Sequence, residues 1–141
     1  MYLWLNLKDF YDGLLGGNYR CFCTKASGEE YYEDVLEKVI IIYLKEDYKY
    51  YDGIVINANG VLGVPITFIR TVIELAIESF GVELIEKNIK FVYTENRVKE
   101  DRIINLINDT IEFYKSKPNN FKHPDNLKYC ERYNLDKNTK T

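Results

Sequence analysis

The chain has 141 residues, which is enough for one hydrophobic core. Its residues are 46% hydrophobic and 29% charged, an ordinary composition for a globular protein. The net charge of −3 is uneven: residues 1–114 hold 12 Lys and Arg against 19 Asp and Glu, and residues 115–141 hold 7 against 3. An acidic body argues against nucleic-acid binding by the folded part.

The first elements are two predicted strands. Residues 2–7 alternate as a strand does, glycines at 13, 16 and 17 mark a turn, and Asn18 to Thr24 is a second candidate strand. A helix then starts at Ser27, because Ser27 and Glu30 have the spacing of a capping box. Its expected core-facing residues are Val35, Leu36, Val39, Ile40, Tyr43 and Leu44.

The middle of the chain predicts a central strand and a second helix. Ile54 to Ala58 is a short apolar, β-branched run, typical of a strand covered on both faces. Asn59-Gly60 turns the chain, and a helix runs from Pro65, expected at its first position, to about Phe80 before Gly81 ends it.

The remaining pattern completes one α/β domain. Ile89 to Tyr93 is a strand, and Arg97 to Lys115 is a third helix with Ile104, Ile107, Ile111 and Tyr114 on one stripe. We therefore expect a single domain over residues 1–116, with right-handed crossovers onto one mixed sheet of about four strands and about three helices. Residues 117–141 form a basic, largely irregular tail, with a short helix near Leu127 to Tyr133.

The second helix carries a narrow polar stripe on an otherwise apolar surface. The stripe and the preceding turn comprise Asn59, Gly60, Thr67, Arg70, Thr71, Glu74 and Glu78. One interpretation is a solvent face with a helix pair between Arg70 and Glu74. The other is a docking surface for a partner protein, because ligand sites of open α/β sheets lie where strands end and helices begin.

No constellation predicts a metal, a cofactor or catalysis. Cys21, Cys23, Cys130 and His123, the only histidine, do not have the spacing of a zinc site. His123 has no nucleophile nearby in the sequence. The first residues, MYLWLNLKDF, lack the basic start of a secretory leader, no segment is apolar for long enough to span a membrane, and the odd cysteine count suits a reducing compartment. We therefore expect a cytoplasmic protein.

Several stretches together resemble the STAS-like domains, relatives of the anti-sigma-factor antagonists. They are DFYDGLLGGNYR at 9–20, SGEEYYEDVL at 27–36, GIVINANGVLGVPITFI at 53–69, SFG at 79–81 and the strand IKFVY. The resemblance covers about three-quarters of the chain. It implies a binding role without catalysis, often with GHKL-type ATPases or kinases as partners. In the antagonists a Ser or Thr at the start of the second major helix is the phosphoacceptor, and Thr67 is the closest position here.

Three functions follow as hypotheses. The chain is a regulatory module that docks on a partner protein through residues 58–78, or a phage or mobile-element inhibitor that blocks a host defence complex with its acidic surface, much as anti-CRISPR proteins do. An enzyme of unknown class is the third.

Overall fold

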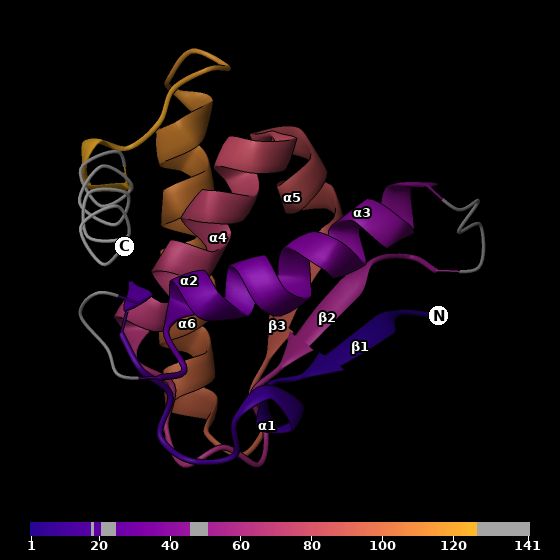
Figure 1. The fold of residues 1–141 in the computed structure, drawn as a ribbon, viewed down its shortest axis with the longest axis vertical. Helices are drawn as coiled ribbons and strands as arrows, with labels where there is room; N and C mark the ends of the chain where they lie inside the picture. The colour runs from indigo at the N-terminus through magenta and orange to yellow at the C-terminus, as the bar shows by residue number, and fades with distance from the viewer. Residues whose placement is uncertain (18, 21–24, 46–50, 127–141) are drawn as a thin grey trace, which may run out of the picture.

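The structure is a computed structural model that describes residues 1–17, 19–20, 25–45 and 51–126 (Figure 1). In chain order the elements are β1 (Leu3–Asn6), α1 (Leu7–Phe10), α2 (Gly28–Tyr31), the π-helical turn η2 (Tyr32–Leu36), α3 (Glu37–Lys45), β2 (Ile54–Asn57), α4 (Ile66–Phe80), α5 (Val82–Asn88), β3 (Ile89–Val92) and α6 (Arg97–Lys115). Within these described ranges, no helix combines the length and apolar character needed to cross a membrane.

The sheet is parallel and three-stranded within the described residues, in the order β1-β2-β3. The prediction of a mixed sheet of about four strands is therefore wrong for this part of the chain. Each strand is joined to the next by helices, and such crossovers return the chain in the same direction. The second strand predicted for Asn18 to Thr24 lies mostly outside the described residues, and Tyr19 and Arg20 are not in a strand.

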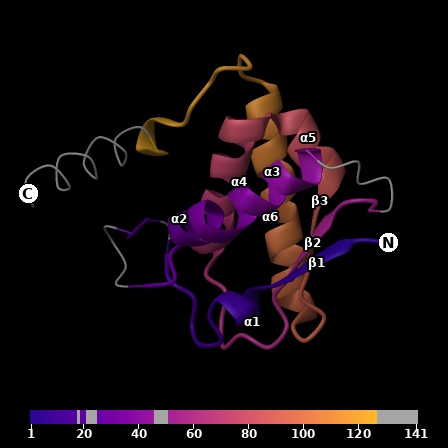
Figure 2. The same ribbon diagram turned by 45° about the vertical axis from the view of Figure 1, so that its right-hand side comes forward.

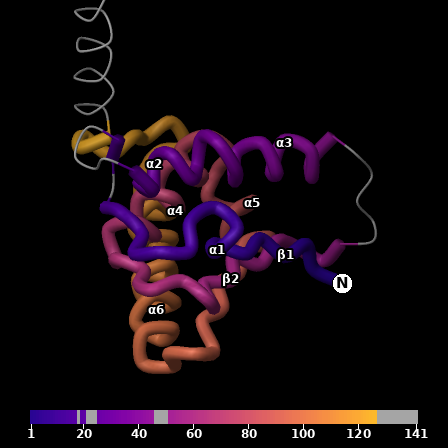
Figure 3. The backbone as a smooth tube through the Cα atoms, turned by 60° about the horizontal axis from the view of Figure 1, so that its bottom comes forward, coloured from indigo at the N-terminus to yellow at the C-terminus, as the bar shows by residue number. Residues whose placement is uncertain are grey.

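The two faces of the sheet have different surroundings. The register aligns Leu3, Ile54 and Ile89 in one row and Leu5, Ile56 and Phe91 in another, and both rows pack into the core with the helices. The alternate row is Trp4, Val55 and Lys90, in which Trp4 and Lys90 are exposed. Figure 3 shows α3 running above the strands. The core therefore lies between one sheet face and the helices.

The helix start predicted at Ser27 is confirmed. The Ser27 Oγ accepts a hydrogen bond of 3.1 Å from the Glu30 backbone N–H, as a capping side chain does. The three consecutive elements α2, η2 and α3 form one continuous helix, which we call the helical rod. Leu36 and Ile40 on the rod are fully buried, and Val35, Val39 and Tyr43 are half-buried. The prediction that Leu44 faces the core is wrong, since Leu44 is exposed. Leu44 lies in the last turn of α3, next to Lys45, which is exposed as well, so the end of the helix extends past the core.

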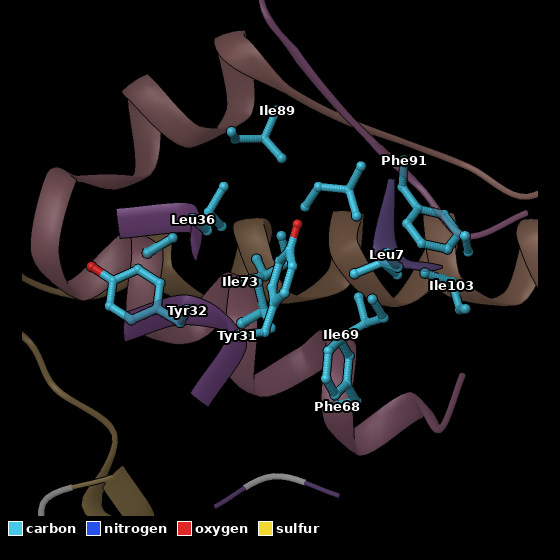
Figure 4. Packing of buried hydrophobic residues seen from close by; sticks show 14 of the residues in the cluster. Leu7, Tyr31, Tyr32, Leu36, Phe68, Ile69, Ile73, Ile89, Phe91 and Ile103 are labelled. Carbon is cyan, nitrogen blue, oxygen red and sulfur yellow. The ribbon is translucent and has the colours of Figure 1, made fainter. Parts of the chain in front are cut away.

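The crossing of α2 over α4 occurs at a glycine. A Cβ added to Gly28 would lie 2.5 Å from the Phe68 carbonyl oxygen and 3.2 Å from the Thr71 Cβ. The next turn of the rod places the Tyr31 ring 5.8 Å from the Phe68 ring, and Figure 4 shows both rings beside Ile69 and Ile73 in the core. Only a residue without a side chain permits this approach.

The later elements follow the prediction closely. Helix α4 ends at Phe80 with Gly81 as its C-cap at a φ of 96°, although Pro65 is the N-cap rather than the first helical residue. Strand β3 and helix α6 lie where they were expected. On α6, Ile111 and Tyr114 are buried as predicted, and Ile103 is more deeply buried than Ile104 or Ile107. The sequence did not predict α1 or α5, which are too short for a periodic pattern.

Replacing Gly28 tests the close approach of α2 and α4. Gly28→Ala is expected to lower the free energy of unfolding by about 1–3 kcal/mol, because the added methyl group must push the two helices apart. Urea unfolding measures this change. Lys38→Ala, an exposed substitution on the same rod, is the control and should change stability far less. Equal effects of the two substitutions would show that the crossing is not a constraint.

Candidate functional site

Two loops lie side by side at the carboxyl ends of the strands. The Leu62 N–H donates to the Gly13 carbonyl at 3.1 Å, and the Leu15 N–H donates to the Gly63 carbonyl at 3.1 Å. Leu14 and Gly63 form an isolated parallel bridge between the same loops. Because Leu15 is buried beside this contact, the loop of residues 11–17 is anchored to the loop of residues 58–65.

The outward side chains of these loops are two leucines. Leu62 is 81% exposed and Leu14 is 65% exposed. A Cβ on Gly63 would lie 2.7 Å from the Leu14 Cδ1, so the glycine leaves the space that the Leu14 side chain occupies. Leu14 and Leu62 are thus exposed apolar side chains on two loops that are hydrogen-bonded to each other, and we call them the leucine pair. Exposed apolar groups mark contact sites where they gather into a patch.

Polar side chains at the same edge of the sheet bond to one another. The Asn57 Nδ2 donates to the Asn6 Oδ1 at 2.9 Å, which links the ends of β1 and β2. The Asn59 Nδ2 donates to the Thr94 Oγ1 at 2.8 Å, and the Asn59 Oδ1 accepts from the Glu95 N–H at 3.0 Å. These bonds hold the loop after β2 against the loop after β3.

Gly60 belongs to the same network. Its N–H donates to the Glu95 Oε2 at 3.0 Å, its φ is +95°, and an added Cβ would lie 2.9 Å from the Lys8 Cδ. The predicted partner-binding residues Asn59 and Gly60 thus bond the loop that carries Leu62 to the loop after β3.

The predicted polar stripe of α4 is divided by its surroundings. Arg70 is exposed and Thr67 is half-exposed, so both are accessible on the first turns of the helix. Thr71 is only 2% exposed, because it packs beneath Gly28 of α2. The expectation that Thr71 lies on an accessible stripe is therefore wrong.

The two acidic residues of the stripe, Glu74 and Glu78, are partly covered by other segments of the chain. The Tyr114 hydroxyl donates to the Glu78 Oε2 at 2.5 Å, and the Asn126 Nδ2 donates to the same oxygen at 2.7 Å. Asn126 is buried and its Oδ1 accepts a hydrogen bond from the Tyr19 hydroxyl. Burial raises the pKa of Glu74, against the opposing attraction of His123 and Arg70.

These contacts come from a segment that returns after α6. Residues 117–126 fold back from the end of α6 (Figure 2), and the Phe121 ring lies 5.7 Å from the rings of both Phe113 and Tyr114. The segment belongs to the predicted irregular tail, yet it packs on α4 and α6. A cavity of about 430 Å³ separates it from the junction of α4 and α5. The rest of that tail, including the predicted helix from Leu127 to Tyr133, lies outside the described residues.

Other predicted features are tested only in part. Cys21, Cys23 and Cys130 lie outside the described residues. Among the residues that the structure does describe, no cluster of three or more His, Cys, Asp or Glu side chains is arranged to hold a metal ion. Thr67 stands in the first turn of α4, so its role as a phosphoacceptor stays a prediction.

Comparisons of the chain with protein-family models, curated proteins and solved structures found no match. The resemblance to STAS-like domains is accordingly a prediction from the residues quoted above.

Sequence reasoning identified the loop after β2 but missed the leucine pair. The available signal was the glycine spacing, since a pair of apolar residues lies between glycines in each loop, Leu14 with Leu15 and Val61 with Leu62. In each pair one side chain is buried and the other is exposed. Nothing in the sequence indicates that the two loops meet.

A pair of Tyr→Phe substitutions tests the contact that covers α4. Tyr114→Phe removes a hydrogen bond to a carboxylate and is expected to lower the free energy of unfolding by about 1–3 kcal/mol. Tyr31→Phe is the matched control, because the Tyr31 hydroxyl is buried with no hydrogen-bond partner among the described residues. That substitution should leave stability unchanged or raise it. Thermal unfolding of both variants measures the difference, and a larger loss in Tyr31→Phe would contradict the assignment.

Proposed function

We propose that this chain is a non-catalytic protein-interaction module that docks on a partner protein through the leucine pair and the first turns of α4. The observation that carries the proposal is the exposure of Leu14 and Leu62 on two hydrogen-bonded loops. Pre-ordered apolar groups lose little conformational entropy on binding, so they suit a docking site.

The polar groups at the same sheet edge support binding rather than catalysis. In open α/β folds this edge is where reactive side chains are presented to a substrate. Here Asn57 and Asn59 bond to neighbouring loops, and Glu95 bonds to the Gly60 backbone. The edge is therefore organised as a scaffold for the projecting leucines.

The charges nearby define the rest of the surface. Arg70 is exposed on α4, and Thr67 lies three residues before it, on the same helix face. A partner that fits would offer an apolar recess for the leucines and an acidic or polar rim beside Arg70. Of the predicted binding residues, Thr67 and Arg70 remain part of the proposed contact, and Asn59 and Gly60 support the loop beside it. The other three, Thr71, Glu74 and Glu78, contact other elements of the chain.

The test uses a partner protein captured with the full chain as bait, and calorimetry then measures its affinity for the chain and its variants. Leu62→Asp and Leu14→Asp are each expected to weaken binding at least about tenfold in calorimetry, because a carboxylate cannot enter an apolar recess. Arg70→Glu should weaken binding less if its contact lies at a wet rim.

Val98→Asp is the matched control, since Val98 is 74% exposed on α6, outside both loops. Wild-type affinity in both leucine variants, or a loss as large in Val98→Asp, would overturn the proposed site.

A further inference from the structure

Within the described residues, no strand pairs with the outer edge of the sheet at β1. Strand β1 is outermost in the sheet order, and Figure 1 shows no described segment along its far side. The Leu3 N–H donates to the Gly53 carbonyl at 2.9 Å, so the backbone N–H and C=O of Leu3 point toward β2. Because alternate residues of a parallel strand bond to the same neighbour, the Trp4 backbone N–H and C=O point to the free edge. An open edge is a template for another strand.

An apolar groove runs beside this edge. Its volume is about 190 Å³, and its lining is Trp4, Leu5, Asn6, Asp9, Phe10, Tyr31 and Val35. Trp4 is the only tryptophan of the chain and is 54% exposed. A half-exposed tryptophan beside an apolar groove has the character of an interface anchor.

The helical rod continues this apolar surface above the strand. Val35 lines the groove, and Val39 and Ile42 follow four and seven residues later on the same helix face. Ile42 is 51% exposed. We call the surface formed by Trp4, Leu5, Phe10, Val35, Val39 and Ile42 the β1 edge surface. Figure 3 shows helix α3 lying over the strands.

Charge along the rod indicates which occupant fits. Its first turns carry Glu29, Glu30, Glu33 and Asp34, four carboxylates that share the single guanidinium of Arg20. Its later turns carry two exposed lysines, Lys38 and Lys45, against one half-buried carboxylate, Glu37. A second rod running antiparallel sets an acidic start beside a basic end at both ends of the contact, and the opposed helix dipoles favour the same arrangement. The surface is thus complementary to itself.

We propose that two copies of this chain form a two-fold dimer in which their β1 strands pair antiparallel and their helical rods pack side by side. Each Trp4 N–H donates to the Trp4 carbonyl of the other copy, which makes one continuous sheet across both copies. This register also sets Leu3 opposite Leu5 of the second copy on the core side. The dimer does not rest on the proposed function, because Leu14 and Leu62 lie outside β1, α2 and α3.

The unmodified chain supplies the first test. The full chain is examined by sedimentation velocity over a wide concentration range, with Trp4 emission and acrylamide quenching recorded on the same samples. The mass is expected to double, while the emission moves to shorter wavelength and quenching falls with the same midpoint. A monomer at every concentration, or a dimer whose Trp4 signal does not change, overturns the proposal. Protection of Trp4 only on addition of a different protein overturns it as well.

Matched variants locate the contact. Ile42→Lys is expected to raise the dimerisation midpoint at least about tenfold, while Val98→Lys, at an exposed apolar position on α6, leaves it unchanged. Circular dichroism confirms that each variant is folded. Leu62→Asp should also leave the midpoint unchanged, so failure of the dimer and failure of the proposed docking site are distinguishable. Equal effects of Ile42→Lys and Val98→Lys would place the contact elsewhere.

Discussion

The close crossing of α2 over α4 at Gly28 is the constraint on which the rest of the structure depends. The Phe68 carbonyl occupies the space where a side chain of Gly28 would stand. This approach sets the height of the helical rod above the sheet, brings Tyr31 against Phe68, and allows Leu36 and Ile40 to reach the core. The Ser27 cap fixes the start of the rod at the same point, so backbone geometry and packing agree there.

The polar residues at the carboxyl edge of the sheet hold neighbouring loops together. Asn57 and Asn59 could have served a ligand, yet their amide groups join three loops that are distant in sequence. These bonds hold the loop that carries Leu62, and backbone hydrogen bonds join that loop to the one that carries Leu14. Both leucines are exposed although burial would be favourable for them. The two loops are therefore ordered before any contact, which supports the docking site proposed above.

Helix α4 illustrates how one amphipathic pattern acquires several roles. Its polar residues recur at helical spacing, but Arg70 meets solvent, Thr71 meets α2, and Glu78 meets the segment that returns after α6. Each outcome depends on an element that lies far away in the chain. A stripe that looks uniform in the sequence is thus exposed at Arg70 and partly covered by other elements along the rest of its length.

The sequence by itself determined the elements with local signals. Ser27 with Glu30 marked the rod, Gly81 ended α4, and apolar runs located β2, β3 and the long helix α6 at close to their observed bounds. Short-range hydrogen bonds and side-chain periodicity decide these features, so they are visible in a window of a few residues. Only the tertiary structure decided the rest: the parallel order of the strands, the burial of Thr71, the contact between the loops that carry Leu14 and Leu62, and the edge at Trp4 that no described strand covers. Each of these depends on contacts between segments tens of residues apart, which no local pattern encodes.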